Sequence, residues 1–563
     1  MRLRRTYANR LKFVFFLLLA VLVSGLMLSS LIHEAGGDRS DRNSVSPFFY
    51  LYTHTEPLHF VLMAFAVLYS PFVLQRTKSA PGLALPRLAK YSTRSIILAA
   101  SVGVLVTTSL GTFAVIRQYP LAVDEFVATF QAKIFARGQI RAHVDPLWQE
   151  FALPMTSNLV LWDPKSNTWI SGYLPVYSAF RALFELTHAP WLTNPLFGML
   201  SVLALAGIAA NVWPGEKYHE LLASLMLVTS PQFLINSMTY YAYPAHLCLN
   251  LTWLWLYTLR KKRGLAVAPW LGVITMGLHQ PVVHALFVAP FILRILFNES
   301  WRVKIYTFGV YAAGCGAWAY WLFGVRTGFD PGSVDGVGAS VFVSYFSWPD
   351  ELAVIRQAMN FSMLASWQSV ALVMLASVAF CGWKDLTPFL RDLALSCLLT
   401  FLFFVFYNVD QGQGFGYRYT YGILGSLALL AVAGWDQLKW SVQASDLLRF
   451  VALSSCLALL VQFPIRCIQT ERFISPFADS MAHIRALKEP FVLVDPWAVW
   501  YAKDLVRNDP FVRNSPKILF ANRVPPELLR KLEVLGPVHR IQPEELIQFG
   551  MHRIKDPVPV TYR

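Results

Sequence analysis

The sequence has few charged residues and no pattern of paired cysteines. Only 14% of its 563 residues are Asp, Glu, Lys or Arg, whereas an average soluble domain contains about 25%. The six cysteines mostly lie inside apolar runs without paired spacing, which indicates neither a disulfide framework nor a zinc site. Internal repeats and low-complexity runs are also missing. Because 55% of the residues are hydrophobic, the composition is that of a polytopic membrane protein.

Apolar runs long enough to cross a bilayer recur along the first 463 residues. A helical span needs roughly 17 to 25 residues. Four prolines, Pro231, Pro244, Pro269 and Pro281, interrupt the runs between 220 and 297, which makes some of these runs candidates for half-helices. We expect about thirteen spans, near 12–32, 58–75, 95–116, 193–213, 220–237, 243–259, 265–280, 282–297, 305–324, 362–381, 389–407, 419–434 and 447–463.

Lysine and arginine gather in alternate loops. The segments "MRLRRTYANRLK", "QRTKSAPGLALPRLAKYSTR" and "RKKRG" are basic, whereas "MTYYAYPAH" and "GLHQPVVH" contain no Lys or Arg. Basic loops stay in the cytoplasm. We therefore expect a multi-pass membrane protein with a cytoplasmic N-terminus. These loops account for part of the net charge of +15, and no basic stripe interleaved with aromatics indicates a nucleic-acid partner.

Three segments are expected outside the membrane, all on the extracytoplasmic side. They cover residues 117–190, 325–361 and 464–563, and the first 463 residues form the transmembrane domain. In the last segment, "FVLVD" and "KILFA" are typical of short buried strands, and "PPELLRKLEVLG" is typical of a helix. The expected fold is thus an α-helical polytopic membrane protein with a small extracytoplasmic α/β C-terminal domain.

The stretch "YPLAVDEFVATFQAKIFARG" places two carboxylates beside an apolar run. Asp124 is a suitable helix N-cap, Glu125 suits the positive end of the helix dipole, and Gly138 suits the helix end. Such a helix would lie flat at the membrane interface. In a second interpretation, acids close to hydrocarbon mark a functional site. They would then act as a general base or bind a divalent cation.

Three motifs resemble one family. "AVDEFVATFQAKIFARGQI" resembles the first-loop signature of the GT-C superfamily of integral-membrane glycosyltransferases. "WISGYLPVYSAFRALFEL" resembles the segment that returns this loop to the membrane in the protein O-mannosyltransferase and aminoarabinose-transferase branches, and "QGQGFGYRYTYGILG" resembles the Gly-rich, Arg-Tyr segment of many bacterial members. The chain departs from the family by the extra spans before the first loop. It also has "SGYLPVY" where the aminoarabinose-transferase branch tends to have a lysine and two prolines.

The resemblance implies a transferase of the bacterial inner (plasma) membrane. It would use a sugar on a polyprenyl phosphate or diphosphate and transfer it with inversion on the extracytoplasmic face. The partners would be this donor, the bilayer and an envelope acceptor, which is a glycolipid, polysaccharide or protein. Asp124 would be the base, and Glu125 would orient the acceptor or help to hold a divalent metal cation, the one cofactor candidate. Arg418 would hold the leaving phosphate, because a guanidinium binds phosphate oxygens in pairs. Backbone N–H groups of the neighbouring glycines would assist.

Further candidates have ordinary structural explanations as well. Tyrosines at helix ends commonly form interfacial belts, histidines commonly pack inside bundles, and basic side chains extend to lipid headgroups. As residues for donor or phosphate binding we add Lys133, His279, His284 and Tyr417, and for sugar or acceptor binding Tyr173, Tyr241 and Tyr243.

A transporter or flippase of lipid-linked glycans is the alternative function. Transporters often show repeated halves and ionisable groups at mid-membrane. Here the polar motifs gather at one face, which favours catalysis at the membrane surface.

Overall fold

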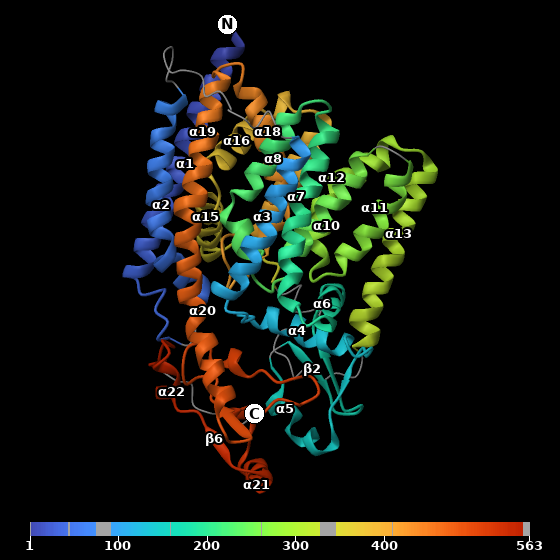
Figure 1. The fold of residues 1–563 in the computed structure, drawn as a ribbon, viewed down its shortest axis with the longest axis vertical. Coiled ribbons are helices and arrows are strands. Elements are labelled where there is room, and N and C mark those ends of the chain that lie inside the picture. The colour runs from blue at the N-terminus through green and yellow to red at the C-terminus, as the bar shows by residue number, and fades with distance from the viewer. Residues whose placement is uncertain are drawn as a thin grey trace.

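The computed structural model describes residues 2–42, 45–74, 92–157, 159–259, 262–326, 345–407 and 409–555. Long helices form a bundle, with the N-terminus at one end and two small sheets at the other (Figure 1). The bundle helices are α1 (Arg2–Glu34), α2 (Pro47–Leu74), α3 (Thr93–Ala114), α7 (Thr193–Val212), α8 (Lys217–Val228), α9 (Pro231–Asn236), α10 (Tyr243–Thr258), α11 (Lys262–Met276), α12 (Pro281–Asn298), α13 (Trp301–Tyr320), α15 (Glu351–Ser366), α16 (Val370–Cys381), α17 (Pro388–Phe406), α18 (Leu424–Leu438), α19 (Ala444–Leu457) and α20 (Phe463–Ala486).

Eight of the described helices are long and apolar enough to cross a membrane. The pair α15 and α16, bent by 118°, makes a ninth span if its two halves are counted together. The other four runs expected as spans are helical in the structure, as α8 with α9, α10, α11 and α13, but they are shorter or less apolar. Proline explains part of this difference, because Pro231 begins a new helix, α9, inside the run 220–237 that was expected as one span.

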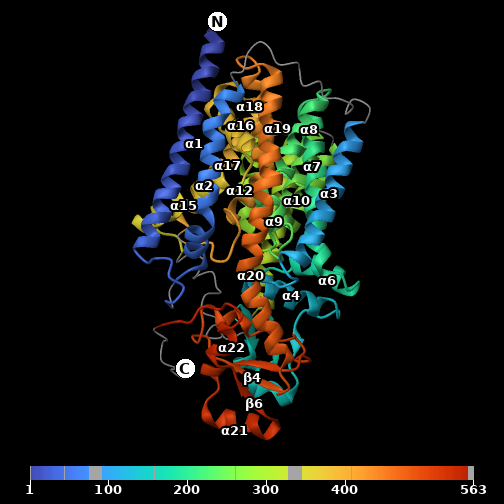
Figure 2. The same ribbon diagram turned by 60° about the vertical axis from the view of Figure 1, so that its left-hand side comes forward.

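The segments around the first loop and the C-terminal segment lie at the same end of the bundle, opposite the N-terminus (Figure 2). This arrangement agrees with the expected parity of the chain crossings. Most of the expected second loop, 327–344, and the basic segment 75–91 lie outside the described residues. The side of the membrane on which each end lies remains a prediction from the basic loops.

The expected boundary between the membrane domain and the C-terminal domain falls inside a continuous helix. Residues Ala444–Ala486 form one helix of 43 residues that leads from the bundle to the small sheets. A proline inside a helix usually breaks it, because its ring clashes with the carbonyl four residues earlier. Here a π-helical turn, Ala458–Gln462, comes just before Pro464, and its wider turn accommodates the ring.

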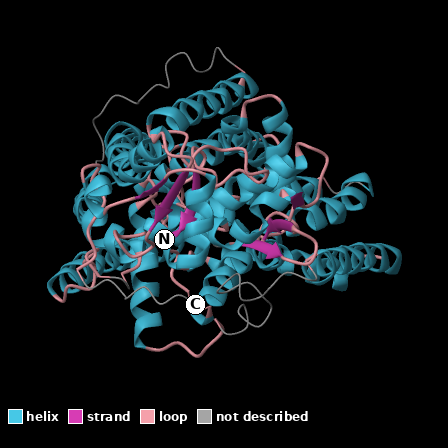
Figure 3. Cartoon of the chain, turned by 90° about the horizontal axis from the view of Figure 1, so that it is seen from below, coloured by secondary structure: helices cyan, strands magenta, loops and turns pink. Residues whose placement is uncertain are grey.

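The lower end of the molecule holds two three-stranded sheets, seen from below in Figure 3. One is antiparallel with the order β1-β3-β2, and the other is parallel with the order β5-β4-β6. The elements are α4 (Val123–Phe135), β1 (Ala142–His143), α5 (Ala152–Met155), β2 (Val160–Asp163), β3 (Thr168–Ser171), α6 (Val176–Leu186), β4 (Phe491–Val494), β5 (Lys517–Phe520), α21 (Pro526–Leu535), β6 (Val538–Arg540) and α22 (Pro543–Ile547).

The first loop and the C-terminal segment share one hydrophobic core. Phe130 of α4 and Trp169 of β3 belong to the same buried cluster as Phe491, Leu493 and Leu519 of the parallel sheet. The indole N–H of Trp169 also donates to the carbonyl of Pro510, at 2.6 Å. Burial of aromatic side chains of this size stabilises by roughly 1.5–3 kcal/mol each. The C-terminal segment therefore supports the helix that carries the Asp-Glu pair.

A buried ion pair joins three parts of the bundle. Arg466 of α20 donates to both carboxylate oxygens of Glu56 in α2, each at 2.7 Å, and both side chains are almost completely buried. Ser366 and Trp367, at the bend between α15 and α16, donate to the same carboxylate. Each oxygen of the carboxylate therefore has a donor besides Arg466, whereas Nε of Arg466 has no hydrogen-bond partner among the described residues.

Candidate active site

Glu125 caps the helix that carries the Asp-Glu pair. The N-cap of α4 is Ala122, so the expectation that Asp124 is the N-cap is wrong. Instead, Glu125 accepts the backbone N–H of Ala122 at 2.9 Å and that of Tyr240 at 2.7 Å. Burial raises the pKa of Glu125 to about 7, although the two N–H donors oppose this rise. With both oxygens used and 1% of its surface exposed, Glu125 ties α4 to the turn before α10.

Asp124 is thereby free to make contacts away from its own helix. Its Oδ1 accepts the hydroxyl of Tyr173 at 2.6 Å, and its Oδ2 lies 3.5 Å from Nη1 of Arg418. Tyr173 lies between β3 and α6, and Arg418 begins the 3₁₀ turn η7 (Arg418–Ile423) that precedes α18. The structure thus brings together one residue from each of the three motifs.

Arg418 lies among aromatic rings. Its guanidinium carbon is 4.9, 5.7 and 5.4 Å from the ring centres of Tyr241, Tyr243 and Tyr419, respectively. Nη1 donates to the carbonyl of Gln413 at 3.2 Å. Its buried Nε has no partner among the residues that the structure describes. The rings, one carbonyl and the carboxylate of Asp124 leave Nε without a partner in the described part of the chain, so this guanidinium retains capacity for a further anion.

The Gly-rich segment before Arg418 forms tight turns. Gly412 and Gly416 have φ angles of 55° and 73°, in the left-handed region that glycine adopts without strain. A Cβ at Gly414 would lie 2.7 Å from Cδ of Arg418. Gln411 holds the segment by accepting the backbone N–H of Arg418 at 2.9 Å. The glycines therefore allow the backbone to fold closely around the arginine.

His279 lies next to this group, between α11 and α12. Its ring centre is 4.0 Å from that of Tyr173, which holds Asp124. Tyr173 therefore lies between His279 and the carboxylate of Asp124 and contacts both.

Three other predicted residues lie elsewhere. His284 is fully buried and hydrogen-bonded to Asn250 at 2.8 Å and to Tyr311 at 3.1 Å, which is the packed state common for a bundle histidine. The hydroxyl of Tyr417 donates to Gln357 at 3.2 Å. Tyr417 is adjacent to Arg418 in sequence, but side chains of adjacent residues need not point the same way. Lys133 lies 3.6 Å from Asp509 and lines a separate cavity.

The C-terminal segment contributes two residues that the sequence analysis missed. Arg507 is buried and donates to the carbonyls of Pro120 and Leu121, just before α4, and its guanidinium lies 4.4 Å from the ring centre of Tyr119. Asp504 is also buried, and burial raises its pKa to about 6, against the lowering effect of Lys503 and Arg507. No motif surrounds these residues, so nothing in the sequence marked them.

Arg181 in α6 is the third residue that the sequence analysis did not single out. It is 1% exposed, its guanidinium carbon lies 4.7 Å from the ring centre of Tyr240 and 5.9 Å from that of Tyr177, and its Nε has no partner within the described part of the chain. The spacing of Tyr177 and Arg181, four residues apart in a segment expected to return to the membrane, was the available signal.

The Asp-Glu pair does not fit a divalent cation in this arrangement. Both oxygens of Glu125 accept N–H groups, and the guanidinium of Arg418 already lies beside Asp124. Elsewhere in the described ranges, one group has suitable atoms close together: His33, Asp38 and His54. Nδ1 of His54, however, lies 2.9 Å from the carbonyl oxygen of Tyr50. A carbonyl only accepts, so this nitrogen carries a proton and is not a ligand.

Comparisons with known proteins show what the fold resembles. No family model and no curated protein matches the sequence. The crystal structure of ArnT from Cupriavidus metallidurans bound to undecaprenyl phosphate matches with a TM-score of 0.50 at 12% identity, over 80% of this chain and 90% of ArnT. The Archaeoglobus fulgidus oligosaccharyltransferase, in complex with zinc and sulfate, matches with a TM-score of 0.38 at 12% identity, over 73% of this chain and 62% of that one. At such identity, the likeness to ArnT shows a common fold.

Proposed function

We propose that this chain, which has the fold of the GT-C membrane glycosyltransferases, transfers a sugar from a polyprenyl-phosphate carrier to an acceptor of the cell envelope. One observation carries the proposal. A partly exposed carboxylate, Asp124, and a buried guanidinium with an unpartnered Nε, Arg418, lie 3.5 Å apart where the bundle ends. These are the two kinds of group that glycosyl transfer from a phosphate requires.

Arg418 would bind the phosphate of the donor and stabilise the charge that develops on it as the sugar leaves. A guanidinium preorganised in a site with little water is effective here, because it needs no rearrangement when the charge appears. The ArnT structure contains undecaprenyl phosphate, which supports a polyprenyl-phosphate donor. The rings of Tyr241 and Tyr243 keep Arg418 in place without neutralising it.

Asp124 would take the proton of the acceptor hydroxyl. Base and leaving group lie on opposite faces of the sugar in an inverting transfer, so the Arg418–Asp124 contact has to open as the sugar enters between them. The hydroxyl of Tyr173 would keep the Asp124 carboxylate oriented during this step, since its bond of 2.6 Å does not involve Arg418. Glu125, with both oxygens on backbone N–H groups, would have a structural task only.

A transfer assay tests the proposal. The purified full chain in lipid nanodiscs is mixed with radiolabelled polyprenyl-linked sugars and with envelope acceptors. The Asp124→Asn variant is expected to lose transfer by roughly 10²- to 10⁴-fold, the usual effect of removing a general base. Glu533→Gln, which removes an exposed carboxylate on α21, is the matched control and should keep full activity. Full transfer by a stably inserted Asp124→Asn variant would exclude Asp124 as the base.

We also infer that transfer occurs on the extracytoplasmic face. Reporter fusions near Ser166 and after Arg563 test the topology, and both should report the extracytoplasmic side. A cytoplasmic signal from either fusion would place the site on the wrong face for a donor sugar carried across the membrane.

A further inference from the structure

A cavity lies at the end of the bundle that carries the small sheets, between α4, the last turn of α20 and residues 507–516. Its volume is about 430 Å³. Its lining includes four cationic side chains and a single carboxylate, that of Asp509. We call it the basic cavity, and its cations are Lys133, Arg485, Arg507 and Arg513.

The cations of the basic cavity are only partly compensated. Asp509 lies 3.6 Å from Lys133, and Arg507 is held by backbone carbonyls. Arg485 and Arg513 form no ion pair within the described residues, although the guanidinium of Arg513 lies 5.8 Å from the ring centre of Phe511. A concave surface with excess positive charge concentrates anions.

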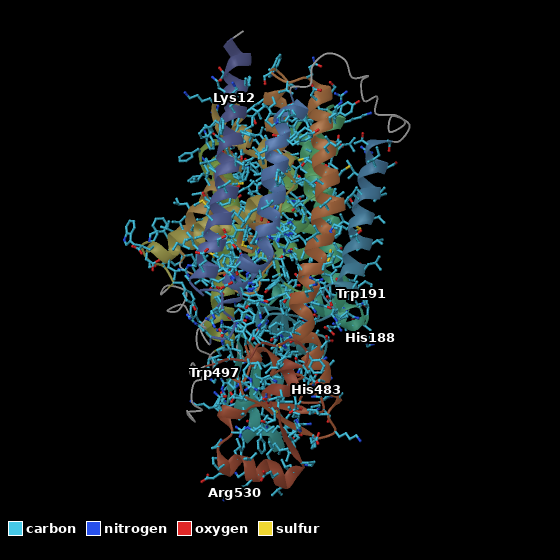
Figure 4. The ribbon with its side chains drawn as sticks, turned by 90° about the vertical axis from the view of Figure 1, so that its left-hand side faces the viewer. Lys12, His188, Trp191, His483, Trp497 and Arg530 are labelled. Atoms are coloured by element: carbon cyan, nitrogen blue, oxygen red, sulfur yellow. The ribbon has the colours of Figure 1, made fainter. Side chains whose placement is uncertain are left out.

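The basic cavity lies too far from the bilayer for a lipid headgroup to be the anion that it binds. The last residue of α20 with a large exposed apolar side chain is Ile468. At a rise of 1.5 Å per residue, Arg485 lies about 25 Å further along the helix. That is far more than the thickness of a headgroup layer, roughly 5–8 Å on each side. His483, close to Arg485, accordingly lies well below the bundle in Figure 4.

Helix α4 lies between the basic cavity and the candidate active site. Asp124 is in its first turn and Lys133 in its last, which separates their backbones by about 14 Å along the axis, and nine residues at about 100° each place their side chains on opposite faces. A molecule that reaches from Asp124 into the cavity must therefore pass around the helix and be considerably longer than one sugar ring. Phe126 of the same helix also lines the cavity.

We propose that the basic cavity binds an anionic group of the acceptor, a carboxylate or a phosphate, at a distance from the hydroxyl that receives the sugar. This proposal rests on the proposed function, because it names the acceptor as an extended anionic glycan or polymer. Lys133, which the sequence analysis assigned to the donor phosphate, then belongs to the acceptor side.

A binding experiment without donor tests this proposal separately from transfer. The full chain in phosphatidylcholine nanodiscs is titrated with fluorescein-labelled hexagalacturonate, and anisotropy reports binding. Arg485→Gln/Arg513→Gln is expected to weaken binding about tenfold, the effect of losing two exposed charge contacts. The matched control is Arg530→Gln/Arg540→Gln, which removes two exposed arginines of α21 and β6 and should bind like the unchanged protein. Arg530 lies at the far tip of the molecule (Figure 4).

Three outcomes would overturn the proposal. The first is equal affinity of the unchanged protein and Arg485→Gln/Arg513→Gln. The second is equal affinity for hexagalacturonate and its neutral methyl ester. The third is that the unchanged protein does not bind hexagalacturonate but selectively retains phosphatidylglycerol. This result would identify the cavity as a lipid-headgroup site. Asp124→Asn should bind hexagalacturonate normally while its transfer falls by roughly 10²- to 10⁴-fold. Failure of the transfer proposal and failure of this one are therefore distinguishable.

Discussion

Replacement of Arg466 by methionine should strongly destabilise the helix bundle. The change leaves the Glu56 carboxylate completely buried, with the hydroxyls of Ser366 and Thr55 and the indole of Trp367 as its remaining donors among the described residues. Breaking a buried pair costs about 3–5 kcal/mol, because the remaining charge has no counter-charge and no water. The loss of the guanidinium above the Trp367 ring, at 3.9 Å, adds to this cost. We therefore expect Arg466→Met to lower the free energy of unfolding by about 3–5 kcal/mol.

Unfolding by SDS in mixed micelles, followed by tryptophan fluorescence, measures this loss. Arg472→Met, at an exposed position of the same helix, is the control and should change stability by less than about 0.5 kcal/mol. The double variant Glu56→Gln/Arg466→Met also lacks the buried negative charge of Glu56. It should therefore be more stable than Arg466→Met alone. Equal stability of Arg466→Met and the control would refute the reasoning. So would a double variant that loses the sum of both single losses, since that result means no coupling between the two charges.

Three further variants test the site and its support. Burial raises the pKa of Glu125 from 4.5 to about 7, so the carboxyl is neutral in the folded protein and ionised in the unfolded protein between these values. Stability should fall by about 3 kcal/mol as the pH rises from 4.5 to 7, and Glu125→Gln should remove this slope in thermal unfolding at several pH values. Tyr173→Phe removes the bond of 2.6 Å to Asp124 and should slow transfer about tenfold or more with unchanged binding of undecaprenyl phosphate; an unchanged rate would contradict its orienting role. In Gly434→Ala the new methyl group would lie 1.9 Å from the carbonyl oxygen of Leu375. The variant should therefore separate α16 from α18 and unfold at a temperature several degrees lower, whereas an unchanged unfolding temperature would contradict this close approach.

Much of the fold follows from local sequence. Apolar runs predict the membrane helices, and short β-branched and aromatic runs predict β4 and β5, because both patterns depend on nearby residues. The number of spans is harder to predict from local sequence, because some prolines end a helix and others do not. The helix continues past Pro464, for example, because a π-helical turn precedes this proline. The contacts of Arg507 with the segment before α4 are harder still to predict. Its partners lie near Pro120, hundreds of residues earlier, and no periodic pattern records so distant a contact.

The division of labour between Asp124 and Glu125 shows where sequence reasoning stops. Both are acids at the start of a helix, where either is favourable for the dipole. Which one caps depends on where the helix begins, and an N-cap at Ala122 turns Glu125 back onto the backbone. The backbone N–H of Tyr240, in a turn far away in sequence, donates to the second oxygen of Glu125. Asp124 is left to face Tyr173 and Arg418, so a shift of the helix start by two residues would exchange the capping carboxylate for the proposed catalytic one.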